Sequence, residues 1–327
     1  MRAIERIWYG GSPVAWLLLP FAALFWIVSG LRRAAYRVGV VATRRLPVPV
    51  IVVGNITVGG TGKTPLVVWL AAHLATRGWR PGVVSRGYGA RAERPTPVDA
   101  ASDPALAGDE PVLIARRAGC PVVVDRDRAR GASWLCEHAR CDLVIADDGL
   151  QHYRLARDLE IAVVDGARRF GNGMLLPAGP LREGRARLRS VDLVVTNGTP
   201  VAGEHGMSLV PGQLYALAEP ARREPLATWR GRAVVAVAGI GNPERFFRTL
   251  EDAGLVVEGR GYPDHHRYDA ADVAPPADGR PVLMTEKDAV KCGLFAGPSH
   301  WVLPVDAVPD PSFVARLDAR LAEISHG

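Results

Sequence analysis

The amino-acid sequence predicts an α/β protein with a mostly parallel sheet flanked by helices, followed by a smaller α/β lobe. Short runs of β-branched residues alternate with helical patterns, which is typical of parallel sheets covered on both faces. The length of 327 residues exceeds what one hydrophobic core usually needs. A third observation, an uncharged apolar run near the N-terminus, predicts a membrane-associated helix in addition to the two lobes.

We therefore divide the chain into three parts. Residues 1–46 are the apolar membrane-associated segment, residues 47–219 form the core domain, and residues 220–327 form the smaller C-terminal α/β domain. The second boundary lies at the start of Pro220 to Trp229, where prolines and charges are mixed as in a linker.

The N-terminal segment has 25 residues without a charge, from Ile7 to Leu31. At about 1.5 Å per residue this run could cross a hydrocarbon core of roughly 30 Å, but its strongly apolar part is shorter and contains Pro20. Both a spanning and an interfacial helix therefore stay open. Arginines follow at once, as is typical of a cytoplasmic flank and unlike the cleavage region of a signal peptide. A buried helix of a soluble protein is the other alternative.

The core domain is predicted to begin with a strand, a glycine-rich loop and a helix, over Val48 to Leu70. Backbone N–H groups of such a loop and the positive end of the helix together bind the phosphates of a nucleotide. Thr57 stands where the strict phosphate-loop pattern has its first glycine, so the match is to a variant loop, and an ordinary βα turn is the alternative. The predicted nucleotide-binding residues are Gly59, Gly60, Thr61, Gly62, Lys63 and Thr64.

Further strands and helices alternate after this loop, as expected of a P-loop NTPase-like sheet. The patterns predict strands over residues 81–85, 121–125, 142–146, 160–165 and 191–197, helices over 65–75, 111–118 and 126–140, and a basic helix ending near Arg189. The second lobe is predicted to contain strands over 233–238, 255–257 and 282–285, a helix on Phe246, Phe247 and Leu250, and a closing helix over 312–324.

An acidic pair, Asp147 and Asp148, follows one of these strands and predicts a magnesium site. A carboxylate at the carboxyl end of a strand beside the phosphate-loop strand can hold magnesium directly or through water. Thr64 and Glu110 are the other candidate metal ligands. A solvated aspartate-glycine turn is the alternative for the pair.

The charge balance points to an anionic partner. The net charge is +6 and only three of the 40 basic residues are lysines: Lys63, Lys287 and Lys291. An ammonium group is a compact point charge suited to a phosphate. Nucleic acid, an anionic membrane surface and a phosphorylated substrate all fit the net charge.

Several short motifs coincide with one family. They are Gly54-Asn55, Gly59-Gly60-Thr61-Gly62-Lys63-Thr64-Pro65, Ser85-Arg86-Gly87-Tyr88, Gly108-Asp109-Glu110-Pro111, Asp127-Arg128, Asp147-Asp148-Gly149 with Gln151-His152, Leu176-Pro177-Ala178-Gly179 with Arg182-Glu183, Pro263-Asp264-His265 and Thr285-Glu286-Lys287-Asp288. In this order they resemble the tetraacyldisaccharide 4'-kinases, the lipid A 4'-kinases of Gram-negative bacteria, over essentially the whole chain. The resemblance implies magnesium-dependent transfer of the γ-phosphoryl group of ATP to the 4'-hydroxyl of a tetraacylated glucosamine disaccharide 1-phosphate. The product would be lipid IVA, formed at the cytoplasmic face of the inner membrane.

The resemblance also implies roles for individual residues. Asp109 and His265 are the predicted catalytic pair. Without the resemblance, the sequence would instead predict Asp109 as a helix cap and His265 as an exposed loop histidine. Predicted substrate contacts are Arg86, Tyr88, Arg128, Gln151, His152, Arg182 and Glu183, for which a surface role is the alternative. We expect inner-membrane lipid as a partner, and neither nucleic acid nor an obligate protein partner.

Two other functions use the same phosphate loop. A membrane-associated switch ATPase would use nucleotide to control partner binding, but gives no role to the distant Pro263-Asp264-His265 motif. A nucleic-acid kinase would explain the basic charge, but gives no role to the apolar N-terminus.

Overall fold

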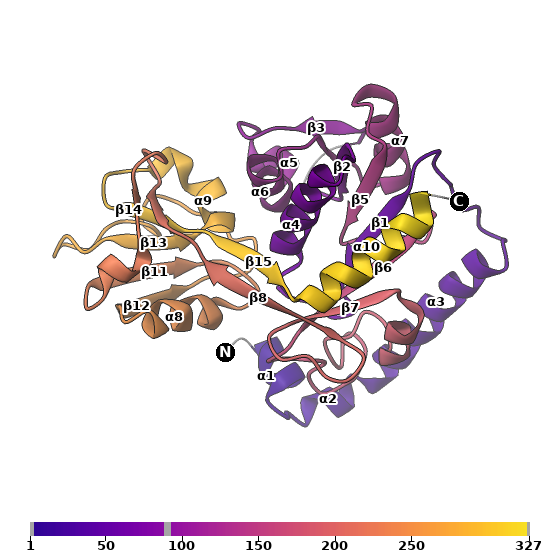
Figure 1. Ribbon diagram of the computed structural model, residues 1–327. Coiled ribbons are helices and arrows are strands. Elements are labelled where there is room, and N and C mark those ends of the chain that lie inside the picture. The colour runs from indigo at the N-terminus through magenta and orange to yellow at the C-terminus, as the bar shows by residue number, and fades with distance from the viewer. Residues whose placement is uncertain (1–2, 88–92, 326–327) are drawn as a thin grey trace.

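The computed structural model describes residues 3–87 and 93–325. Two sheets form the cores of two lobes (Figure 1). In spatial order the first sheet consists of β15 (Val305–Pro309), β8 (His205–Pro211), β7 (Leu193–Asn197), β6 (Leu159–Asp165), β1 (Val50–Gly54), β5 (Leu143–Asp147), β2 (Pro81–Ser85), β4 (Val122–Val124) and β3 (Thr96–Val98). All pairs from β8 to β4 are parallel, and only β15 and β3 pair antiparallel, at the two edges. The predicted mostly parallel α/β sheet is confirmed.

The strand β1 lies in the middle of this sheet, between β5 and β6, and is fully buried. In register, Val53 lies beside Asp147, so the phosphate loop after β1 and the acidic pair after β5 leave the sheet at the same edge. Ligands of open α/β sheets bind at the carboxyl ends of the strands. The topology therefore brings the two predicted motifs together.

Helices cover both faces of the first sheet, because each sheet face is lined by apolar side chains. The helices of this lobe are α4 (Lys63–Thr76), α5 (Pro104–Ala107), α6 (Asp109–Arg117), α7 (Arg128–His138) and α10 (Pro311–Ser325). The core on one face includes Leu66 and Leu70 of α4 and Ile114 of α6. The core on the other face includes Ala132 and Leu135 of α7.

The second sheet has a parallel centre and two antiparallel strands at one edge. Its spatial order is β10 (Arg223–Glu224), β9 (Leu214–Ala216), β14 (His300–Leu303), β13 (Val282–Thr285), β11 (Ala233–Ala238) and β12 (Val256–Gly261). The helix α8 (Pro243–Asp252) packs on one face through Phe246, Phe247 and Leu250. Ala289 and Cys292 of α9 (Glu286–Cys292) pack on the other. Two short 3-10 helices, η2 (Leu226–Trp229) and η3 (Gly293–Phe295), complete this lobe.

The chain crosses between the two sheets more than once, so the sheets divide it differently from the predicted domains 47–219 and 220–327. The strand β9 joins the second sheet before residue 220, whereas β15 and α10 return to the first sheet. Phe313 and Leu317 of α10 are fully buried in the first core, and His73 of α4 lies 2.7 Å from Asp318. The apolar stripe of a terminal helix predicts that one face is buried, but the sequence of the helix does not predict which lobe buries it.

Local elements differ from the predictions in several places, and the sequence patterns predict no strand at the positions of β8, β9, β10, β14 and β15. The predicted basic helix near Arg189 is a 3-10 helix, η1 (Arg185–Ser190). The predicted strand at 255–257 begins at Val256 and continues to Gly261. The strand β3 and the helix α5 lie in a stretch for which the sequence patterns predict neither a strand nor a helix, because proline and alanine hide the pattern.

Three helices form an N-terminal arm, residues 3–37, alongside the first lobe (Figure 1). They are α1 (Ala3–Tyr9), α2 (Val14–Leu17) and α3 (Leu19–Arg37). Within residues 3–87 and 93–325, none of the helices combines the length and the hydropathy that a membrane crossing requires. The arm is fixed to the first lobe by Trp8, whose indole N–H donates to the Pro177 carbonyl at 3.0 Å.

Large apolar side chains of this arm are exposed. They are Ile4, Val14, Trp16, Leu17, Phe21, Leu24, Trp26, Ile27, Val28 and Leu31. Trp16 and Leu17 are 66% and 75% exposed, and only Ala15 and Ala22 of α2 and α3 are buried. A surface of this kind on a folded chain marks an interaction site.

Candidate active site

The phosphate loop connects β1 to α4 and depends on glycine for its shape. Gly59 and Gly62 have φ angles of 116° and 96°, which side chains other than glycine rarely adopt. Gly62 caps α4, so Lys63 begins the helix at its positive end. The Thr61 hydroxyl is buried and has no hydrogen-bond partner among the described residues. The loop thus presents backbone and hydroxyl donors to an anion.

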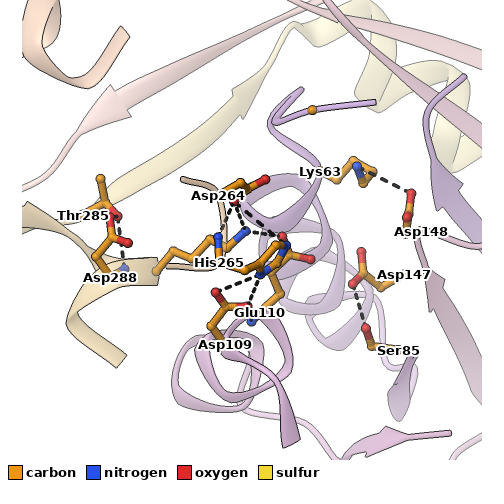
Figure 2. Close-up of polar contacts among 12 residues, drawn as sticks. Lys63, Ser85, Asp109, Glu110, Asp147, Asp148, Asp264, His265, Thr285 and Asp288 are labelled. Carbon is orange, nitrogen blue, oxygen red and sulfur yellow. Dashed lines mark hydrogen bonds and ion pairs between the residues drawn. The ribbon is translucent and has the colours of Figure 1, made fainter. Parts of the chain in front are cut away.

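The Lys63 ammonium points toward the acidic pair (Figure 2). Its Nζ donates to Asn55 Oδ1 at 3.2 Å and lies 3.5 Å from Asp148 Oδ1. Asn55 is fully buried at the end of β1. The side chain is therefore held beside the loop by groups of the protein.

The second lobe touches the phosphate loop directly. A Cβ atom on Gly241 would lie 2.5 Å from the backbone nitrogen of Gly60, so only glycine permits this approach. Arg168 Nη1 of the first lobe donates to the Gly241 carbonyl at 2.8 Å, and its Nη2 lies 3.3 Å from Glu5 Oε1 of α1. The N-terminal arm, the phosphate loop and the second lobe therefore meet at one place.

The two members of the acidic pair have different environments. Asp148 receives two bonds from Arg182 Nη1, at 2.8 and 3.0 Å, in addition to the Lys63 contact. Burial opposes its ionisation, but Lys63 and Arg182 outweigh that effect and hold the pKa of Asp148 well below its ordinary value. The backbone of Asp148 has a φ of 48°, a conformation unusual for residues other than glycine. Asp148 is thus neutralised by cations of the protein.

Asp147, in contrast, has few partners. Ser85 Oγ donates to its Oδ2 at 3.0 Å (Figure 2), while its Oδ1 is buried without a partner among the described residues. Burial, followed by the nearby charges of Glu110 and Asp148, raises the pKa of Asp147 to about 7. A buried carboxylate crowded by like charges is the environment that a cation relieves.

These residues fit a magnesium ion that is bound mainly through phosphate and water. In the part of the chain that the structure describes, no three His, Cys, Asp or Glu side chains are grouped so as to hold a metal by themselves. Magnesium usually takes only one or two protein carboxylates and completes its shell with phosphate oxygens and water. Asp147, with its free oxygen, and the nearby Glu110 satisfy that requirement. Thr64 lies half-buried in the first turn of α4.

The structure brings the predicted catalytic pair together across the two lobes (Figure 2). His265 Nδ1 lies 3.0 Å from Asp109 Oδ1 and 3.1 Å from Oδ2. Asp109 begins α6 and is 5% exposed. Burial alone would raise its pKa, but the His265 hydrogen bond and the charge of Lys287 hold the pKa of Asp109 well below its usual range. Burial likewise opposes protonation of His265, yet the bond to Asp109 leaves the pKa of His265 raised.

The predicted substrate residues form a network that runs from the phosphate loop to the N-terminal arm. Gln151 Nε2 donates to the Asn55 carbonyl at 3.1 Å and to Glu183 Oε2 at 3.0 Å. Glu183 also accepts from the Tyr153 hydroxyl and lies 3.8 Å from Arg33 of α3. The network therefore connects the base of the phosphate loop with the arm that exposes apolar side chains.

Arginines and a histidine lie beside this network. Arg128 Nη2 donates to the backbone carbonyl of Asp148 at 2.8 Å. Burial, then the charge of Arg128, lowers the pKa of His152 to about 4, so that its ring is neutral near pH 7. Arg86 is exposed at the end of β2. Burial lowers the pKa of Arg128, and the nearby positive charge of Arg86 lowers it further. Tyr88 lies outside the described residues.

Sequence reasoning did not assign several residues that the structure places here. Asn55 anchors Lys63, Ser85 bonds Asp147, and Asp264 contacts Lys287 at 3.0 Å. Lys287 and Lys291 both contact carboxylates of the site. Lysine is rare in this arginine-rich chain, and this rarity distinguishes the two residues in the sequence. It does not predict which carboxylates they contact.

The chain is similar to proteins of one family. The family model of tetraacyldisaccharide-1-P 4'-kinase matches residues 14–322. A tetraacyldisaccharide 4'-kinase of Shewanella amazonensis is 52% identical over 96% of this chain and 94% of its own length. That of Alkalilimnicola ehrlichii is 54% identical over 99% of this chain and 98% of its own. Among solved structures, LpxK from Aquifex aeolicus in complex with ATP is similar with a TM-score of 0.79 and 29% identity, over 95% of this chain and 99% of that one.

Proposed function

The chain belongs to the tetraacyldisaccharide 4'-kinase family, and on this premise we propose how its residues carry out the reaction. The protein is a phosphotransferase with an alcohol group as acceptor. It transfers the γ-phosphoryl group of ATP to the 4'-hydroxyl of tetraacyldisaccharide 1-phosphate, a step of lipid A biosynthesis that gives lipid IVA. The single observation that carries the mechanism is the meeting of Asp109 and His265 across the lobes, beside the phosphate loop and the acidic pair.

The phosphate end of ATP binds over the loop of residues 59–64. Backbone N–H groups of the loop and the N-terminus of α4 contact its phosphate oxygens, and Lys63 neutralises charge that develops during transfer. Asp147 and Glu110, with Thr64, would hold a magnesium ion there. When bound, this ion supplies positive charge to the phosphate oxygens.

The acceptor hydroxyl must lose its proton as its oxygen forms the new O–P bond, while the bond between the γ-phosphorus and the β,γ-bridging oxygen breaks and ADP leaves. An oxygen of the ionised Asp109 carboxylate accepts that proton, and the low pKa of Asp109 ensures that the carboxylate is ionised near neutral pH. His265 Nδ1–H donates to the same carboxylate and fixes its direction. Because the histidine comes from the second lobe, approach of the lobes completes this pair.

The lipid lies between the phosphate loop and the N-terminal arm. Arg128, Arg182 and Gln151, which lie around Asp148 and Asn55, contact its sugar and phosphate groups. The exposed apolar side chains of α2 and α3 enter the cytoplasmic leaflet of the inner membrane. The two helices lie in the membrane interface and do not span the bilayer. Arg32, Arg33 and Arg37, which follow on α3, suit the anionic headgroups. The acyl chains of the substrate then stay in the bilayer while its headgroup reaches the site.

The test is transfer of the terminal phosphoryl group of labelled ATP to purified tetraacyldisaccharide 1-phosphate in detergent micelles, followed by chromatography of the lipid. We expect label on the disaccharide with the natural chain and very little with Lys63→Ala. Label released only as inorganic phosphate, with unmodified lipid, would favour a switch ATPase and contradict the proposal.

A further inference from the structure

All three lysines of this chain lie in the candidate active site. Only three of its 40 basic residues are lysines, and each contacts a site carboxylate. The phosphate-loop motif explains why residue 63 is a lysine. Lys287 and Lys291 lie outside that motif, on α9 in the second lobe. Lysine has a compact charge on a flexible stem, and arginine has a wide planar group. In a chain that otherwise uses arginine, two lysines at these positions indicate that a small cation is required.

The two lysines pair with two neighbouring carboxylates. They are four positions apart on α9 and therefore share one face of the helix. Lys287 Nζ lies 2.7 Å from Glu110 Oε1, and Lys291 Nζ lies 3.5 Å from Asp109 Oδ2. Asp109 and Glu110 form the first turn of α6 in the first lobe. One helix of the second lobe thus contacts both the predicted base and a candidate metal ligand.

Each ammonium group is also held from within its own lobe. Lys291 Nζ lies 3.2 Å from Asp288 Oδ1 and 5.1 Å from the centre of the Tyr268 ring. Asp288 is fully buried and fixed by the Gly239 N–H at 3.1 Å and the Thr285 hydroxyl at 2.7 Å. The side chains of Lys287 and Lys291 are only 14% and 12% exposed. Lys291 is therefore held by its own lobe as well as by the carboxylate that it meets in the first lobe.

Lys287 has a comparable anchor. Its Nζ lies 3.0 Å from Asp264 Oδ1, on the residue that precedes His265. The same loop thus supplies the partner of Lys287 and the histidine that bonds Asp109. Movement of this loop and α9 together would bring all three cationic groups to α6 at once.

Without these lysines, adjacent carboxylates in the first turn of α6 would lose the cations that balance their charges, and His265 would contact Asp109 alone from the second lobe. Like charges repel, and the repulsion grows where water is excluded. A carboxylate that takes a proton in a transition state must also keep its direction to well within an ångström. His265 contacts both oxygens of Asp109 from one side, and Lys291 approaches Oδ2 from α9.

We propose that Lys291 and Lys287 are positioning residues of the kinase reaction, Lys291 acting through Asp109 and Lys287 acting through Glu110. The inference rests on the proposed function of this site and adds to it two residues that do not touch the reacting atoms. It also explains why the site is incomplete in either lobe alone.

The experiment is a pair of double-mutant cycles on kcat for phosphoryl transfer to tetraacyldisaccharide 1-phosphate. The first combines Lys291→Met with Asp109→Asn, and the second combines Lys287→Met with Glu110→Gln. Methionine keeps the length of the stem without its charge. We expect each lysine variant alone to lose about tenfold or more in kcat with little change in KM for ATP. In the background that lacks its partner carboxylate, the same substitution should change kcat by less than about twofold.

A lysine that merely stabilises the fold would give the same loss in both backgrounds, and that result would overturn the inference, as would an unchanged kcat in the single variants. The control is Arg280→Met, which removes a charge from a surface pair with Glu258 at 2.8 Å in the same lobe and should leave kcat unchanged.

Thermal unfolding identifies a variant that fails to fold, and the other lysine's cycle then decides the inference. Loss of the proposed function is distinguishable, because the natural chain itself would then transfer no label to lipid. The same cycles, measured on release of phosphate from ATP, would in that case still decide whether each lysine acts through its carboxylate.

Discussion

His265 Nδ1 lies 3.0 Å from Asp109 Oδ1 although 156 positions separate the two residues in the chain. The pair joins the loop after β12 to the N-terminus of α6, and therefore one lobe to the other. If the two side chains act as a unit, Asp109→Ala and His265→Ala should each lower kcat on the order of 10²-fold or more, with little change in KM for ATP. The double variant should be scarcely slower than the slower single variant. Losses that multiply would show that the residues act independently.

The same pair predicts a pH dependence of stability. The folded-state pKa of His265 lies above its ordinary 6.5, so its contribution to the free energy of unfolding is fully present below pH 6.5 and is lost as pH rises through the folded-state pKa. The pKa of Asp109 lies below its ordinary 3.8, so its contribution is present above pH 3.8 and is lost as pH falls through the folded-state pKa. The pair therefore stabilises the fold most between these two ordinary values.

Urea unfolding of the natural chain and of His265→Gln measures this effect. The difference in free energy of unfolding should be larger at about pH 5.5 than at about pH 8.5. In the Asp109→Asn background the difference should lose most of its pH dependence. A difference that grows with pH would contradict the assignment.

The acidic pair should divide its roles. Asp147 Oδ1 is buried and has no hydrogen-bond partner in the described part of the chain, whereas Asp148 is neutralised by Arg182 and Lys63. We therefore expect Asp147→Asn to raise the magnesium concentration needed for half-maximal activity several-fold or more. Asp148→Asn should instead lower kcat, because Lys63 and Arg182 lose their common anchor, with a smaller change in the magnesium requirement. Titration of both variants with magnesium at saturating ATP compares them, and equal shifts would refute the division.

The N-terminal arm should control binding to lipid. Trp16→Glu combined with Phe21→Glu places two charges on the exposed apolar surface and should release much of the protein from vesicles that contain anionic lipid. Flotation on a density gradient measures the bound fraction. The control is Leu294→Glu, because Leu294 is 95% exposed but lies in the second lobe. Equal binding of all three proteins would contradict an interfacial role of the arm.

Arg168 should affect ATP binding although it belongs to none of the predicted motifs. It bonds the Gly241 carbonyl at 2.8 Å, and Gly241 rests against Gly60 of the phosphate loop. Arg168→Met should raise KM for ATP several-fold with a smaller effect on kcat. The substitution removes a contact that supports the phosphate loop, and it leaves the catalytic pair Asp109 and His265 unchanged. The neighbouring Arg169 pairs with Glu204 at 2.7 Å, a contact that involves no residue of the phosphate loop, so Arg169→Met is a matched control. An unchanged KM in the Arg168 variant would show that the contact is dispensable.

Local sequence determined the units from which the site is built. The run of β-branched residues before a glycine-rich turn gave β1, the phosphate loop and α4 with nearly correct ends, because strand propensity, glycine conformation and helix start signals all act over a few residues. The strands β2, β11 and β13 were likewise predicted at their observed positions. The family motifs indicate Asp109 and His265 as a catalytic pair without any information about their distance.

Tertiary structure alone decided which of these units meet. No local pattern states that α10 returns to the first lobe, that Gly241 rests on the phosphate loop, or that Lys287 of α9 reaches Glu110 of α6. The same holds for the acidic pair, whose two carboxylates are neighbours in the chain but differ because Arg182 reaches only Asp148. Each contact depends on burial and charge contributed by segments far apart in sequence, and periodicity along the chain carries no information about such partners.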